Sequence, residues 1–154
     1  MSKTGVGARL RRKEDDRFLH GRGQYIGDIL LPRMREAAFV RSPVAHARLT
    51  GIRIPDRLRP SVFTATDLTG VRPIRAVSPL PGFQVSEQPP LVADKIRHVG
   101  ELIAMCVADT RAQAEDIAAE VTVEYEELPA VVDMLAAQAP ESVLVHETVK
   151  RNIF

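Results

Sequence analysis

Four histidines, one cysteine and a cluster of three glutamates are the residues of this 154-residue chain whose types suit catalysis or metal binding. No two of the histidines lie three or four residues apart, the spacing that places two metal ligands on one helix face; they are His20, His46, His98 and His146. Cys106 lies inside an apolar run, where a thiol usually packs as a small hydrophobic group with a raised pKa. Glu124 and Glu126 alternate with apolar residues and Glu127 follows them, so we expect water beside the first two and ordinary pKa values. These residues predict no catalytic site and no metal site within the chain.

Three glycines near the N-terminus have the spacing G-x-G-x-x-x-G, which is one residue too long for the dinucleotide-binding fingerprint. They are Gly21, Gly23 and Gly27, and no predicted strand leads into them. Backbone reversal explains them better than phosphate binding, so no cofactor-binding residue is predicted. A single cysteine also excludes an internal disulfide framework and an iron–sulfur or zinc site made only of this chain's cysteines.

The composition, with 45% apolar and 27% charged residues, is that of one compact globular domain. A net charge of +1 gives no electrostatic reason to bind nucleic acid or an anionic membrane. No apolar run is long enough to span a bilayer and no signal sequence is recognisable, so we expect a cytoplasmic protein. The charges are nevertheless segregated, with nine Lys/Arg against four Asp/Glu in residues 1–35 and seven Asp/Glu against one Arg in 111–133. Two such faces suit protein partners, although each could simply be a solvated surface.

The first half of the chain predicts short elements separated by turns. Residues 1–13 have no apolar periodicity and are expected to form a mobile basic arm ahead of one domain, 14–154. A helical turn is expected over 15–20, ended at Gly21. Strands are expected over 36–41, over 48–54 with a bulge at Gly51, and over 61–64. Five prolines and two glycines in 70–90 predict a long irregular loop.

The second half predicts a strand, a helix and a strand that share one core. The run LIAMCVA at 102–108 has no alternation, which is typical of a central strand covered on both faces. Thr110 and Gln113 have capping-box spacing ahead of an amphipathic helix over about 110–120. Val123 and Tyr125 alternate with polar residues and are expected in the same layer as 102–108; one or two helical turns are expected over 132–137. The predicted fold class is α+β, with a mixed sheet, one main helix and the Pro-rich loop.

The segment 11–28 combines several arginines with a glycine turn and two aromatic residues, a composition enriched at protein interfaces. We expect it to be an interface element, and its candidate contact residues are Arg12, Arg17, Phe18, Arg22, Tyr25 and Asp28. The alternative is that Phe18 and Tyr25 pack locally under the sheet while Arg22 stays solvated. Nucleic-acid binding through the arginines is disfavoured, because only Phe18 lies among them to stack on bases.

Five stretches, in this order, resemble the amino-terminal domain of the molybdenum-binding subunit in the xanthine dehydrogenase, aldehyde oxidase and carbon monoxide dehydrogenase family. They are RRKEDDRFLHGRGQYIGDI (11–29), RSPVAHARLTGI (41–52), LVADKIRHVGELIAMCVADTRAQAED (91–116), VEYEELPAVVD (123–133) and VHETVKRNIF (145–154). Two positions depart from the family's pattern: Gly27 replaces a second aspartate before Asp28, and Leu102 replaces a proline after Gly-Glu.

The resemblance implies an α/β hammerhead domain that precedes the domains enclosing a molybdopterin cofactor. The parent enzyme would use molybdenum, 2Fe-2S clusters and FAD, inserting a water-derived oxygen at a carbon centre and passing electrons through the clusters to flavin. Implied partners are the remaining molybdenum-binding domains or catalytic subunit, the iron–sulfur subunit and the FAD subunit. The chain would then be a structural and docking domain, or a small subunit of a split enzyme, and inactive alone. A free-standing hammerhead module that binds another protein without enzyme activity is the alternative.

We expect the isolated chain to have no oxidoreductase activity and to bind no molybdopterin, iron–sulfur cluster or flavin, since it has one cysteine and no phosphate-binding loop. Metal analysis and an absorption spectrum of the purified chain test this. Stoichiometric molybdenum or a flavin band would contradict it.

Overall fold

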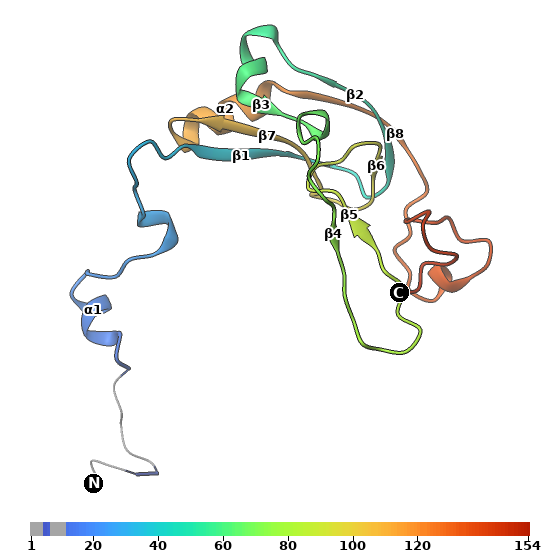
Figure 1. The fold of residues 1–154 in the computed structure, drawn as a ribbon, viewed down its shortest axis with the longest axis horizontal. Coiled ribbons are helices and arrows are strands. Elements are labelled where there is room, and N and C mark those ends of the chain that lie inside the picture. Colours follow the sequence, from blue (N-terminus) through green and yellow to red (C-terminus); the bar gives the residue numbers. More distant parts are fainter. Residues whose placement is uncertain (1–4, 7–11) are drawn as a thin grey trace. The chain divides into compact units, whose positions relative to one another are not determined.

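The computed structural model describes residues 5–6 and 12–154, so most of the predicted basic arm lies outside the described residues. The chain divides into two compact units, one ending at Met34 and one spanning Arg35–Phe154. The predicted boundary at residues 13 and 14 stays a prediction. Figure 1 shows the elements of each unit along the chain.

The first unit contains one short α-helix and one short 3-10 helix. Helix α1 spans Asp15–Leu19, followed by His20 and by Gly21 at φ +65°, the left-handed conformation that glycine adopts without strain. The 3-10 helix η1 spans Ile26–Asp28. The predicted helical turn and its glycine stop are therefore confirmed.

The second unit is built on two three-stranded sheets. The first has the order β1-β7-β3, with β1 at Glu36–Arg41, β7 at Leu102–Ala108 and β3 at Val62–Phe63. The second has the order β6-β2-β8, with β6 at Lys95–Ile96, β2 at Ala47–Arg53 and β8 at Thr122–Glu127. All strand pairs among the described residues are antiparallel, so the mixed sheet was a wrong expectation. The physical reason is that β7 and β8, which flank the main helix, enter different sheets, so the helix makes no parallel crossover.

The main helix α2 spans Arg111–Glu120 and confirms the predicted capping box. The Thr110 hydroxyl accepts a hydrogen bond from the Gln113 amide at 3.3 Å, and the Gln113 side chain accepts one from the Thr110 amide at 3.2 Å. The helix packs against β1 and β7 with Ala114 buried and Ile117 half-buried. The α+β class, with one main helix, is therefore confirmed.

Strand β7 contributes to both hydrophobic clusters of the domain through a bulge. Its pairing with β1 shifts between Val40, opposite Ala104, and Arg41, opposite Leu102, which leaves Ile103 as the extra residue. Ala104 and Cys106 belong to a cluster with Val62 and Val121, covered by α2. Ile103 is fully buried in the other cluster, with three residues from the second sheet and the loop before β6: Ala47, Val92 and Ile96. The predicted single core is thus two clusters; β7 contributes to both, and Ile52 of β2 packs against both.

The sheet β1-β7-β3 is covered on one face only. Its α2 side carries the buried residues Ala104, Cys106 and Ala108. On its other side the residues of the three strands are half-buried or exposed: Ala37, Phe39, Phe63, Leu102, Met105 and Val107. The expectation that β7 is covered on both faces is therefore wrong for residues 35–154, although the side chains of the second face are apolar.

Strand β2 contains the bulge predicted at its glycine. Pairing with β8 shifts between Leu49 and Gly51, which leaves Thr50 unpaired. The bulge explains how Leu49 and Ile52, three residues apart, both pack on the cluster around Ile103. β8 has the expected alternation, with Val123 and Tyr125 half-buried, but in the second sheet.

The remaining regular elements are short 3-10 helices and one two-stranded sheet. The 3-10 helices η2, η3 and η4 span Asp56–Ser61, Ala65–Asp67 and Ala136–Gln138. The 70–90 loop is less irregular than predicted, because β4 at Ile74–Arg75 pairs with β5 at Glu87–Gln88. No helix of the described residues is long and apolar enough to cross a bilayer.

Replacing Ile103 with Ala should lower the free energy of unfolding by about 2–5 kcal/mol, because the side chain is fully buried where the two clusters meet. Ile117→Ala should cost less, since Ile117 is only half-buried. The exposed Glu126→Ala on β8 is the control and should change stability by no more than about 0.5 kcal/mol. Urea unfolding measures all three, and equal losses for Ile103 and Glu126 variants would contradict the placement of the core.

Candidate functional site

The predicted interface segment forms a stacked turn in which three of its candidate residues meet. The rings of Phe18 and Tyr25 stack with centroids 5.7 Å apart at an interplanar angle of 17°. The guanidinium carbon of Arg17 lies 5.3 Å from the centroid of the Phe18 ring. This stack is not buried, since Phe18 is 41% and Tyr25 65% exposed.

Backbone contacts hold this turn in shape. The Asp28 carboxylate accepts a hydrogen bond from the Tyr25 amide at 2.9 Å, and the Asp15 carboxylate accepts one from the Arg12 amide at 3.1 Å. A Cβ on Gly23 would lie 2.6 Å from the Phe18 ring, so the chain passes too close to the ring for any larger residue without a shift. Arg22 is exposed. Arg12, Asp28 and Arg22 therefore lie around the stack but outside it.

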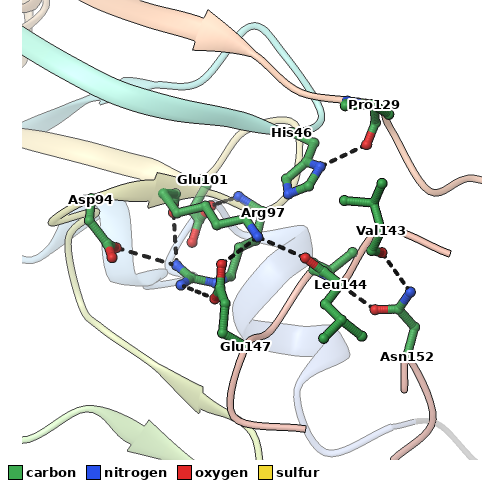
Figure 2. A network of polar contacts seen from close by, with 11 residues as sticks. His46, Asp94, Arg97, Glu101, Pro129, Val143, Leu144, Glu147 and Asn152 are labelled. Atoms are coloured by element: carbon green, nitrogen blue, oxygen red, sulfur yellow. Dashed lines mark hydrogen bonds and ion pairs between the residues drawn. The ribbon is translucent and has the colours of Figure 1, made fainter. Parts of the chain in front are cut away.

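A second polar cluster, shown in Figure 2, joins the C-terminal segment to β6. The Lys95 ammonium donates to the Leu144 carbonyl at 2.7 Å and to the Glu147 carboxylate at 2.6 Å. The Arg97 guanidinium lies 3.5 Å from the same carboxylate and donates to the Lys95 carbonyl at 2.8 Å. Both cationic side chains are largely buried, at 12% and 14% exposed. Glu147 thus ties a segment without regular structure to a strand of the second sheet.

Asn152 closes the loop that carries Glu147. Its side-chain oxygen accepts from the Val145 amide at 2.9 Å, and its amide nitrogen donates to the Val143 carbonyl at 2.9 Å. His46 makes a further tie, since its Nδ1 lies 2.7 Å from the Pro129 carbonyl, which can only accept; Nδ1 therefore carries the proton. The segment after β8 is held by side chains instead of strand pairing.

Electrostatics of this cluster favour the charged form of Glu147. The hydrogen bond from Lys95 is the largest cause, and it holds the pKa of the Glu147 carboxyl at about 2 against partial burial. Burial lowers the pKa of the neighbouring His146, and the charge of Arg97 adds to this effect. His146 packs edge-on to Phe154, with ring centroids 5.5 Å apart. These contacts are typical of a structural tie.

The residues that could do chemistry are not brought together. Burial raises the pKa of the Cys106 thiol, which confirms its predicted role in the core. Within the part of the chain that the structure describes, no group of three or more His, Cys, Asp and Glu side chains could hold a metal ion. Three buried polar atoms lack a partner among the described residues: His46 Nε2, Arg97 Nε and Glu101 Oε1.

Reasoning from the sequence missed the cluster around Lys95. Its members come from residues about 50 positions apart, and no local spacing connects Lys95 with Glu147. The available signal was indirect: both residues lie in stretches that carry the family resemblance, DKIRHVGE and VHETVKRN. Glu101 is only 3% exposed. Reasoning from the sequence missed this burial too, because a Gly-Glu turn suggests an exposed carboxylate.

The Glu147 tie should weaken in acid. The pKa of Glu147 in the folded chain, about 2, lies below the ordinary value of 4.5 for a glutamate. The stabilisation by this carboxylate is therefore complete above about pH 5 and is lost as the pH falls toward 2. Glu147→Gln should lower stability at pH 6 by no more than about 1 kcal/mol, because the carboxylate is largely exposed. The variant should also lose less stability than the parent chain between pH 6 and pH 3.

Thermal unfolding at the two pH values measures the difference. Glu141→Gln, at an exposed carboxylate on the same segment, is the matched control and should behave like the parent chain. An unchanged pH dependence in Glu147→Gln would show that the tie does not contribute.

Comparisons with known proteins match most of this chain to one protein family. Residues 20–129 match the family described as aldehyde oxidase and xanthine dehydrogenase, a/b hammerhead domain. The carbon monoxide dehydrogenase large chain of Afipia carboxidovorans is 34% identical over 147 residues, which cover 95% of this chain and 18% of that protein. The chain therefore spans less than a fifth of the length of this relative.

Two solved structures have the same fold. Quinoline 2-oxidoreductase from Pseudomonas putida 86 is 44% identical, with a TM-score of 0.76 over 83% of this chain and 17% of that one. The Cu,Mo-CO dehydrogenase is 34% identical, with a TM-score of 0.77 over 94% of this chain and 18% of that one. The match of 20–129 includes both sheets and the main helix. The chain belongs to the a/b hammerhead domain family of aldehyde oxidase and xanthine dehydrogenase.

Proposed function

We propose that the chain is a structural and docking domain of the large, molybdenum-binding chain of an oxidoreductase in this family. The observation that carries the proposal is coverage: 95% of this chain corresponds to only 18% of a carbon monoxide dehydrogenase large chain. A domain that is one part of such a chain must present surfaces to the other parts. The exposed stack of Arg17, Phe18 and Tyr25 is such a surface.

The redox chemistry belongs to other parts of the proposed enzyme. The described residues offer one buried thiol and no group of possible metal ligands, so no step of the reaction is assigned to them. Molybdopterin, 2Fe-2S clusters and FAD are proposed to be held by the remaining molybdenum-binding domains, the iron–sulfur subunit and the FAD subunit. The assembly is proposed to be cytoplasmic, since a chain with one cysteine suits a reducing compartment.

The docking role is assigned to the segment from Arg12 to Asp28. Arginine and aromatic side chains contribute most to binding when they lie at the centre of an interface and lose their water there. Phe18 and Tyr25 are already aligned by stacking, so little side-chain entropy remains to be lost on binding. Arg22 projects from the same turn with its charge exposed, where it can meet a carboxylate or backbone carbonyl of a partner.

Arg22→Ala should weaken assembly with the other large-chain domains at least about tenfold while leaving the melting temperature of this chain nearly unchanged. The physical reason is that Arg22 is exposed and its loss removes contacts to a partner, not to the domain. Arg72→Ala, at an exposed arginine of the 70–90 loop, is the matched control and should assemble normally. Co-purification and titration with the co-expressed large-chain domains measure the effect.

A large loss of stability with intact assembly would show that the turn is a folding element instead. A wild-type chain that binds none of the large-chain domains would contradict the proposed function itself and favour a free-standing module.

A further inference from the structure

Strand β1 is an edge strand with its pairing complete on one side only. It is the terminal member of the order β1-β7-β3, and its six residues pair only with β7. Edge strands in natural proteins are usually blunted by proline, lysine or a covering segment. The four central residues of β1, Ala37 to Val40, include no proline and no charge. The free edge of β1 can therefore pair with another strand.

The hydrogen bonds next to β1 show which of its backbone groups face outward. The Ser42 amide donates to the Glu101 carbonyl at 2.9 Å, and the Ser42 carbonyl accepts from the Gly100 amide at 2.8 Å, so Ser42 faces the β7 side. Because backbone groups alternate in direction along a strand, Ala37, Phe39 and Arg41 direct their N–H and C=O groups away from β7. Within residues 35–154, these outward groups have no hydrogen-bond partner.

A groove of about 480 Å³ runs beside this edge. Its β1 wall includes Ala37, Ala38 and Phe39, and its α2 wall includes Arg111, Glu115 and Ala118. The alanines on both walls leave room for side chains of an incoming strand. A helix beside a free strand edge is the geometry in which several peptide-binding domains add a strand to their sheet.

The charged side chains of the groove are two arginines and two glutamates, so their formal charges sum to zero; they are Arg41, Arg111, Glu36 and Glu115. The Arg111 guanidinium donates to the Glu115 carboxylate at 2.7 Å, and the Arg41 guanidinium donates to the Gly100 carbonyl at 2.9 Å while lying 5.8 Å from the Phe39 ring. The groove therefore has no net formal charge that would favour a charged ligand. It fits an extended, uncharged segment whose affinity comes from backbone hydrogen bonds.

The half-buried face of the same sheet extends this surface. Phe39, Met105 and Val107 lie on the side away from α2, where the rest of residues 35–154 does not bury them fully. In an added strand, alternate side chains point to the two faces of the sheet. One set would enter the groove beside Ala118, and the other would continue the apolar face beside Phe39.

We propose that the free edge of β1 accepts an extended, uncharged strand from the rest of the large chain, which adds a fourth strand to the sheet β1-β7-β3. This inference rests on the proposed function, because the strand is assigned to polypeptide that the longer relatives possess. This chain corresponds to only 17–18% of those relatives, so ample polypeptide is available to supply it. The added strand would bond to the outward groups of Ala37, Phe39 and Arg41.

Amide hydrogen exchange tests the proposal, with the chain assembled in its large subunit compared with the chain alone. In the assembly, the Ala37 and Phe39 amides should exchange about 100-fold more slowly than in the isolated chain. The Ala38 and Val40 amides face β7 and should be protected in both states, which makes them the internal control for a folded domain. Rapid exchange of Ala37 and Phe39 within an intact assembly would overturn strand addition while leaving the proposed function in place.

A pair of variants at Ala37 tests the same hydrogen bonds by binding. Ala37→Pro removes an outward N–H that β7 does not use, so it should weaken assembly at least about tenfold. Ala37→Ser keeps the N–H and should assemble within about twofold of the parent chain. Equal assembly of the two variants would contradict the proposal. If Ala37→Pro fails to fold, the exchange experiment with the unmodified chain decides alone.

Two further outcomes separate the alternatives. Protection of Ala37 and Phe39 that grows with the concentration of the isolated chain would assign the edge to a second copy and overturn the proposed occupant. Failure of the chain to enter any large-chain assembly would remove the proposed function, and the proposed strand with it.

Discussion

Both hydrophobic clusters of this domain depend on the change of register in β7 at Ile103. A regular strand would place Ile103 on the same side as Met105 and Val107, where the sheet is half-exposed. The extra residue instead buries Ile103 completely against Ala47 and Ile96 of the second sheet. Ala104 and Cys106 remain under α2. β7 therefore contributes to both clusters, and Ile52 of β2 links them as well.

The C-terminal segment is held by polar contacts and not by apolar packing of strands. After β8 the chain forms only the short helix η4 among its described regular elements, and its position is set by a few buried polar contacts. Lys95 and Arg97 lose most of their water on burial, which costs free energy unless each finds a partner. Glu147 and backbone carbonyls supply those partners, so the segment is held by the need to satisfy two cations. The tie depends on the ionisation of its charged side chains, whereas the bulge in β7 is packed against apolar side chains.

The exposed arginine–aromatic stack and the unpaired edge of β1 agree with the proposed role as one part of a larger protein. A stacked arginine and two aromatic rings lie exposed on one compact unit. An unpaired strand edge and an apolar sheet face lie exposed on the other. Exposed apolar groups gain from burial against a partner, and a free strand edge can pair with another strand. A domain without an arrangement of reactive side chains can still serve an enzyme by presenting such surfaces.

Local patterns in the sequence were sufficient for the elements whose causes are local. The helix after Thr110 follows from a capping box and an apolar stripe, the bulge at Gly51 from an out-of-phase leucine, and the stop after α1 from a glycine that adopts positive φ. The inert role of Cys106 followed from its apolar neighbours. Composition also singled out the segment 11–28, whose role as an interface stays a prediction.

Only the tertiary structure decided how these elements combine. An apolar run such as 102–108 predicts a central strand, but its residues do not say which face a partner covers or that Ile103 leaves the register. The covered face depends on how α2 packs, and the register depends on pairing with β1, more than 60 residues earlier in the chain. The antiparallel order of the sheets, with β7 and β8 separated, likewise depends on long-range pairing. Lys95 and Glu147, about 50 residues apart in the sequence, form an ion pair because the buried ammonium of Lys95 needs a partner. No spacing in the sequence indicates this pair.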